Sequence, residues 1–218
     1  MRPLSRVYEE QAAEGRFGEH WAGPPEMVDR IAQIAGTRSD RRVLDLGCGL
    51  GGPARRLAGR VGCRVVGVDV VVPVLAEARR RSPSEVRYVA ASGQRLPFRA
   101  ATFGEVWSLG MVAHVPDLGT CAAEVMRVLR SGGLLLVTEA FWDGRRGPRF
   151  AGVAPQPWRP LLAEDLASAL LEAGMTHVSL KEWPGREFSS DEDVEDPLLR
   201  ADLLDGRLRS GMVLARKP

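Results

Sequence analysis

Residues 43–53 read VLDLGCGLGGP, a short apolar run followed by a glycine-rich turn and a proline. The apolar run is typical of a buried strand, and Pro53 is typical of the first turn of a helix. Gly47, Gly49 and Gly52 have the GxGxxG spacing of turns that bring the backbone close to a nucleotide. The stretch therefore predicts a strand, a tight turn and a helix, with a nucleotide-like ligand at the turn.

Short β-branched runs alternate with helical patterns from about residue 40 onward. This alternation predicts an α/β fold, in which a doubly wound, mostly parallel seven-stranded sheet carries helices on both faces. The expected strands are Arg42–Leu46, Arg64–Asp69, Val86–Val89, Glu105–Leu109, Leu134–Glu139, Thr176–Glu182 and Ser210–Ala215. Helices are expected to begin near Pro53, Pro73 and Leu118, and one more is expected over Ala163–Ala173.

The segments outside this alternation are less regular. One or two helices are expected before residue 40, with Met27, Ile31 and Ile34 on one buried face. The acidic segment Pro184–Arg207 has little periodicity, which predicts a loop with at most one helical turn.

The composition is that of a globular chain: 218 residues, 44% hydrophobic and 27% charged, with a net charge of +2. Interspersed charges of both signs argue against a nucleic-acid partner. No apolar stretch approaches the roughly 20 residues that span a bilayer, and the chain start lacks a signal-like core. The three scattered cysteines lack metal-ligand spacing. We expect a cytoplasmic monomer or homodimer without a metal, and a single domain over 1–218 made of an N-terminal helical cap (1–40), a cofactor-binding half (41–140) and a substrate-side half (141–218).

Asp45 bears on the choice of cofactor because it lies two residues before Gly47, at the end of the first expected strand. A dinucleotide would place its pyrophosphate at the start of the next helix, where this carboxylate would repel it. S-adenosylmethionine instead carries an ammonium and a sulfonium, which an acid favours. Here the sequence resembles the class I S-adenosylmethionine-dependent methyltransferases, whose first motif is an acid followed by glycines at this spacing. The alternative is a turn that needs glycine only for its positive φ.

Two later segments extend this resemblance. Asp69 ends the second expected strand, where an acid accepts hydrogen bonds from a ribose diol; NAD would use it equally, and it could instead cap the next helix. Residues 91–98, ASGQRLPF, resemble the family loop that begins Gly-Asp-Ala and ends Leu-Pro-Phe, with Ser92 at the position of the adenine-facing Asp. The resemblance implies adenine recognition by the Ser92 hydroxyl, assisted by Gly93, Gln94 and Val70.

The region after the fourth expected strand completes the match. Residues 106–117, VWSLGMVAHVPD, and 124–133, EVMRVLRSGG, resemble the family's fourth strand and its following helix, with Ser131 replacing a usual proline. The resemblance covers about residues 40–140. It implies further cofactor contacts from Gly47, Gly49, Gly51, Ser108, Leu109 and His114. A looser match lets Tyr8 and Trp21 fold over the cofactor as a lid, or simply pack on the sheet.

His114 and Glu139 are the candidate catalytic residues. Both follow strands of the predicted sheet, at the carboxyl edge where ligands gather, and His114 could act as a base for a protonated acceptor. His114 could also only contact the cofactor, and Glu139 could be a solvated strand end. Three aromatic residues of the segment 141–160 indicate an apolar acceptor pocket or a packed cover: Trp142, Phe150 and Trp158.

The sequence lacks the Asn/Asp-Pro-Pro-Tyr/Phe motif of enzymes that methylate base or amide nitrogens, so nucleic-acid bases and protein glutamines are less expected as acceptors. The prediction is methyl transfer from S-adenosylmethionine to an O, N or C atom of a small molecule. The alternatives are a non-catalytic module that binds S-adenosylmethionine and, less favoured, an NAD-dependent oxidoreductase.

Overall fold

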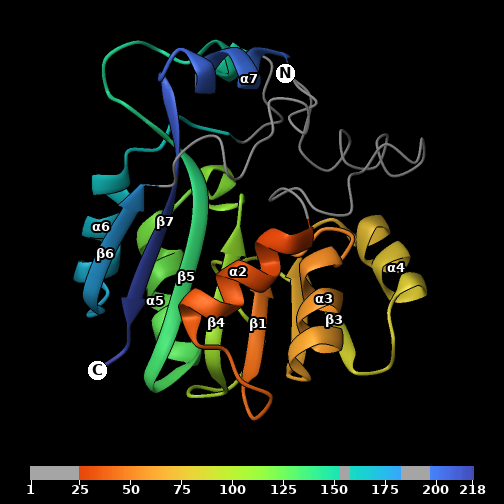
Figure 1. Ribbon diagram of the computed structural model, residues 1–218. Coiled ribbons are helices and arrows are strands. Elements are labelled where there is room, and N and C mark those ends of the chain that lie inside the picture. The colour runs from red at the N-terminus through yellow and green to blue at the C-terminus, as the bar shows by residue number, and fades with distance from the viewer. Residues whose placement is uncertain (1–24, 153–157, 183–196) are drawn as a thin grey trace.

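Seven strands form one sheet in the order β3-β2-β1-β4-β5-β7-β6 (Figure 1). The structure, a computed structural model, describes residues 25–152, 158–182 and 197–218. Neighbouring strands from β3 to β5 are parallel, and β7 is antiparallel to both β5 and β6. The α/β prediction is therefore confirmed. The strands are β1 (Arg42–Leu46), β2 (Arg64–Asp69), β3 (Val86–Ala90), β4 (Phe103–Leu109), β5 (Leu129–Trp142), β6 (Thr176–Glu182) and β7 (Leu208–Arg216).

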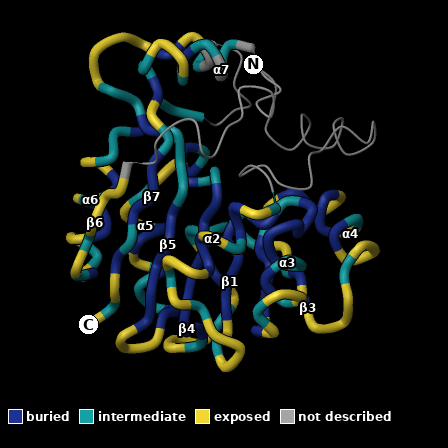
Figure 2. The backbone as a smooth tube through the Cα atoms, viewed as in Figure 1, coloured by how far each residue is buried: buried dark blue, intermediate teal, exposed yellow. Residues whose placement is uncertain are grey.

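Helices cover both faces of the sheet, as the alternating pattern predicts. Helices α2, α3 and α4 pack on one face and α5 and α6 on the other, each pair of layers enclosing its own apolar core (Figures 1 and 2). The helices are α2 (Pro25–Ala35), α3 (Gly52–Val61), α4 (Val72–Arg81), α5 (Leu118–Val128), α6 (Ala163–Glu172) and α7 (Pro197–Leu204), with 3-10 turns η1 (Val112–His114) and η2 (Arg149–Gly152).

Local sequence signals fix where these helices begin and end. Helix α3 has Pro53 in its first turn and ends at Gly62, whose φ of 77° is left-handed. Helix α5 begins after Asp117, whose carboxylate accepts the Thr120 backbone N–H at 3.0 Å. These boundaries agree with the predicted ones.

Three expectations about the outer elements were wrong. Ile34 is 38% exposed, and the buried face of α2 is formed with Val28 and Ala32 instead. The segment predicted as a loop contains α7, a helix of eight residues. Its Asp202 is fully buried and lies 3.8 Å from Nε of Arg207, a tertiary contact that local periodicity does not reveal. Strand β5 is also longer than predicted at both ends, because β7 pairs with it as far as Trp142 and Leu129 pairs with Phe103 of β4.

The sheet order positions the ligand site. The chain moves outward from β1 to β2 and β3, then returns to β4 on the other side of β1. In doubly wound sheets, the carboxyl ends of the two strands at such a reversal form the binding crevice. The glycine turn follows β1 directly, and η1 follows β4. No helix within the described ranges is both long and apolar enough to cross a membrane.

Candidate active site

The glycine turn between β1 and α3 is tightly wound. The backbone N–H groups of Gly47 and Cys48 both donate to the carbonyl oxygen of Val68 in β2, at 2.8 and 3.0 Å. Gly47, Gly49 and Gly51 all have left-handed φ values, of 78°, 50° and 75°. The turn therefore needs glycine at these three positions, whereas Gly52, the last glycine of the GxGxxG spacing, begins α3.

Two neighbouring side chains press against these glycines, and sequence reasoning missed both. A Cβ added to Gly47 would lie 2.6 Å from Cβ of Met111, and one added to Gly51 would lie 2.6 Å from Cζ of Tyr88. Tyr88 itself lies against Gly67 of the neighbouring strand. A glycine inside a β-branched strand is the one sequence signal that could have indicated this close approach.

Asp45 lies beneath the turn as a buried acid. It is 2% exposed, and its Oδ2 atom has no hydrogen-bond partner among the residues that the structure describes. Burial, followed by the charge of Asp69, raises the pKa of Asp45 to about 7, against a smaller lowering by a backbone hydrogen bond from Ala54. A buried acceptor without a partner is costly, and a cationic donor would satisfy it. Asp45 therefore fits the amino acid portion of S-adenosylmethionine.

Asp69 organises the turn on the other side. Its two carboxylate oxygens accept the backbone N–H groups of Gly49 and Val71, each at 2.9 Å. Burial raises the pKa of Asp69, while these backbone hydrogen bonds oppose the rise. A carboxylate oxygen has more than one lone pair, so the same group can still accept from a ribose hydroxyl. The structure thus places Asp69 between the glycine turn and the segment leading into α4.

The predicted adenine side is open and partly apolar. Val70 is 56% exposed, as a contact surface for a flat ring requires. The Ser92 hydroxyl accepts the Gln94 backbone N–H at 3.2 Å, so it also closes its own turn. A Cβ on Gly93 would lie 3.2 Å from Sγ of Cys121, so this glycine faces the protein interior. Adenine contacts by Ser92, Gly93 and Gln94 stay predictions.

The end of β4 contributes buried groups. Ser108 is 1% exposed, and its hydroxyl has no hydrogen-bond partner among the described residues. Leu109 belongs to the apolar core on the α2–α3 face, so a cofactor contact from it would come from its backbone. Tyr8 and Trp21 lie outside the described residues.

Glu139 holds the η1 turn that carries His114. Its Oε2 atom accepts the Ala113 backbone N–H at 3.2 Å, and its Oε1 atom accepts the Ala140 N–H at 3.1 Å. The segment before α6 holds the same turn from another direction, through Arg159 N–H and the Ala113 carbonyl at 3.0 Å. Burial raises the pKa of Glu139 to about 7. Glu139 is therefore a half-buried acid engaged by two backbone N–H groups rather than a solvated strand end, and its carboxylate holds the backbone one residue before His114.

This raised pKa has a consequence for stability. In the unfolded chain Glu139 ionises near its ordinary value of 4.5, whereas in the folded protein it does so at about 7. The unfolded state therefore releases its proton first as pH rises, and the free energy of unfolding falls until both states are ionised. The free energy of unfolding of a Glu139→Gln variant, relative to that of the wild type, should therefore rise by on the order of 1–3 kcal/mol from about pH 5 to about pH 8.

Urea denaturation at the two pH values measures this difference, with Glu172→Gln as the control. Glu172 is exposed at the end of α6, so its substitution should leave the pH dependence unchanged. A stability difference between Glu139→Gln and the wild type that does not vary with pH would contradict the burial argument.

Comparisons with known proteins agree with this geometry. Residues 44–137 match a methyltransferase domain family. The chain is 35% identical over 167 residues to malonyl-[acyl-carrier protein] O-methyltransferase of Enterobacter lignolyticus, covering 73% of this chain and 66% of that protein. It is 36% identical over 114 residues to sterol 24-C-methyltransferase of Eremothecium gossypii, covering 50% of this chain and 31% of that protein. The chain thus spans less than two thirds of either relative.

A solved structure shows the same fold. The phosphoethanolamine N-methyltransferase 2 of Haemonchus contortus, in complex with S-adenosyl-L-methionine, superimposes with a TM-score of 0.79 at 22% identity. The match covers 98% of this chain and 56% of that one. Because the family match begins within β1 and ends in β5, it includes the glycine turn, Asp45 and Asp69. The chain belongs to the class I S-adenosylmethionine-dependent methyltransferases.

Proposed function

We propose that this protein transfers a methyl group from S-adenosylmethionine to an O, N or C atom of a small-molecule acceptor. The observation that carries the proposal is the buried Asp45 carboxylate, whose Oδ2 atom lacks a partner among the described residues beside a turn of three left-handed glycines. A phosphate-bearing dinucleotide would meet repulsion there, and a cationic sulfur nucleoside would meet attraction.

Each predicted contact has a physical role in this proposal. S-adenosylmethionine supplies a methyl group already activated by the positive sulfur. Asp45 and the glycine turn would hold its amino acid portion, and Asp69 its ribose. Val70 and the turn at Ser92 would hold the adenine. Positioning of this kind can account for most of the catalysis, because a displacement mainly needs its reacting atoms aligned in a dry site.

His114 is the proposed proton acceptor where the methyl acceptor carries a proton. It lies on η1 after β4, at the carboxyl edge of the sheet, and Glu139 fixes the backbone of that turn. The η1 turn is short and is held through both backbone groups of Ala113. Met111, just before it, packs on Gly47, so His114 keeps its position relative to the glycine turn.

His114→Ala should lower turnover by about 10²-fold, as expected for loss of a general base, without abolishing the binding of S-adenosylhomocysteine. Turnover is measured as S-adenosylhomocysteine release with a panel of acceptors whose nucleophile is a hydroxyl, an amine or a carbon atom. Calorimetry measures the binding of S-adenosylhomocysteine to the variant and the wild type. Unchanged turnover in the variant would remove His114 from proton transfer. Absence of turnover by the wild type with every acceptor would favour the non-catalytic module.

Several finer points belong to the same proposal. The interspersed charges and the net charge of +2 support a small molecule rather than a nucleic acid as acceptor. We also propose that the chain acts as a single domain in the cytoplasm, as a monomer or homodimer.

A further inference from the structure

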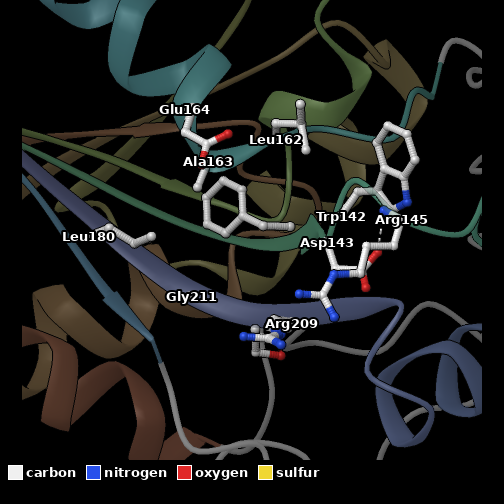
Figure 3. A pocket seen from close by; sticks show the side chains of 11 residues that line it. Trp142, Asp143, Arg145, Leu162, Ala163, Glu164, Leu180, Arg209 and Gly211 are labelled. Atoms are coloured by element: carbon white, nitrogen blue, oxygen red, sulfur yellow. Dashed lines mark hydrogen bonds between the residues drawn. The ribbon is translucent and has the colours of Figure 1, made fainter.

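A pocket of about 230 Å³ lies beyond the carboxyl end of β5, between β5, β7 and the start of α6 (Figure 3). In the paired register, Glu139 faces Gly211 and Phe141 faces Arg209. Side chains two apart on a strand share one face, so the pocket continues along the same sheet face as Glu139. The pocket is therefore an extension of the proposed active-site edge.

The floor of this pocket is apolar and is kept open by a glycine. The apolar side chains that line it are Phe141, which is 5% exposed, and Leu162 and Leu180, which are labelled in Figure 3. A Cβ on Gly211 would lie 3.0 Å from the Phe141 ring and 3.4 Å from Cδ1 of Leu180. Any larger side chain at 211 would occupy the space above this floor.

One rim of the pocket is cationic. Arg145 and Arg209 both line it, and both lower the pKa of Asp143, after the larger effect of the Arg145 backbone N–H. The Asp143 carboxylate already accepts that N–H at 2.9 Å. The rim therefore places two guanidinium groups beside the Asp143 carboxylate, which is itself engaged in its own turn. Glu164, in the first turn of α6, also lines the pocket, on the side away from Arg209 (Figure 3).

The backbone of the turn that follows β5 is held by contacts with the segment before β7. Asp143 N–H donates to the Arg207 carbonyl at 3.1 Å, and Arg207 Nη1 donates to the Gly147 carbonyl at 3.1 Å. Arg149 forms an ion pair with Asp205, next to the end of α7. These contacts tie the turn after β5 to the segment that leads into β7. Such preorganisation lowers the entropic cost of binding a ligand.

We propose that this pocket binds the end of the methyl acceptor remote from the reacting atom, and that this end is an apolar, aryl-sized body bearing an anionic oxygen group. The apolar body lies on Phe141, and the carboxylate or phosphate oxygens lie against Arg145 and Arg209. Arginine pairs suit such groups because their N–H donors are planar and permanently charged. The inference rests on the proposed function, because it assigns a specificity site to the same reaction.

Three probes in the presence of S-adenosylhomocysteine test this site: 3-phenylpropionate, phenyl phosphate and the neutral 3-phenylpropanamide. Ligand-observed NMR titrations should give Kd values on the order of 1 mM for at least one anion, and binding of the amide about tenfold weaker. Arg209→Gln and Arg145→Gln should each weaken anion binding about tenfold. Arg87→Gln, an exposed arginine of β3 at the far end of the sheet, should change nothing.

Equal binding of the anions and the amide, no saturable binding of any probe, or anion binding unaffected by both pocket substitutions would overturn the proposal. The affinity for S-adenosylhomocysteine, measured on each variant, distinguishes a failure of the pocket assignment from a failure of the proposed function. If S-adenosylhomocysteine binds normally while the anion preference is missing, only the pocket assignment fails. If S-adenosylhomocysteine itself does not bind to the wild type, the proposed function fails.

Discussion

Asp45→Asn should bind S-adenosylmethionine at least about tenfold more weakly than the wild type and yet be the more stable protein above neutral pH. Asn has nearly the same shape but cannot carry the negative charge that attracts an ammonium and a sulfonium. The loss should grow from about pH 6 to 8, because Asp45 has a pKa of about 7 and becomes anionic over that range. Comparison with the wild type at each pH cancels the titration of the ligand itself.

The stability gain has the same origin. Asp45 ionises near 3.8 in an unfolded chain and at about 7 when buried, so the folded state loses stability as pH rises between those values. Removing the carboxyl should therefore raise the free energy of unfolding above pH 7 by on the order of 1–3 kcal/mol, with little effect near pH 4. Calorimetric binding and urea denaturation measure the two effects.

Asp165→Asn is the matched control for the Asp45 variant. Asp165 is exposed in the first turn of α6, so its substitution should leave binding unchanged and stability nearly so. An Asp45→Asn protein with full affinity for S-adenosylmethionine would remove the electrostatic basis of the cofactor assignment. One less stable than the wild type above pH 7 would show that Asp45 has a structural partner.

Gly51→Ala should destabilise the protein by about 2–4 kcal/mol and abolish measurable binding of S-adenosylhomocysteine. The φ of Gly51 is 75°, a value that strains any L side chain. The added Cβ would also lie 2.6 Å from Cζ of Tyr88. Tyr88 cannot easily retreat, because it is 7% exposed and its hydroxyl is 2.7 Å from the Ser82 hydroxyl.

Gly206→Ala separates the cost of the left-handed backbone from the cost of the contact with Tyr88. Gly206 has a similar φ of 69°, but an added Cβ would meet nothing within 4 Å. It should cost only about 1 kcal/mol, which is the backbone contribution alone. Equal costs for the two substitutions in urea denaturation would show that Tyr88 does not constrain the turn. Retained binding of S-adenosylhomocysteine by Gly51→Ala would show that the turn tolerates a side chain.

The sheet and the cofactor-side acids could be predicted because their signals are local. Each central strand contains a short apolar run, and the turn after β1 carries its own glycine spacing and its own acid. Strands β1, β2 and β6 have the predicted bounds. The carboxyl ends of parallel strands meet at one edge, so Asp45 and Asp69 could be placed together without a structure.

The parts that could not be predicted depend on contacts between distant segments. Tyr88 reaches the glycine turn only because β3 lies beside β2 in the sheet, with Tyr88 in register with Gly67. Helix α7 rests on tertiary contacts, including the buried Asp202, rather than on periodicity. The role of Glu139 at the backbone of η1 likewise follows from the fold of a loop.

The most direct test of the account is one calorimetric comparison of S-adenosylmethionine, S-adenosylhomocysteine and NAD on the wild-type protein. We expect saturable binding of both sulfur nucleosides at the crevice beside β1 and no binding of NAD, because the buried carboxylate under the glycine turn repels a pyrophosphate. Tight binding of NAD together with no binding of either sulfur nucleoside would contradict it.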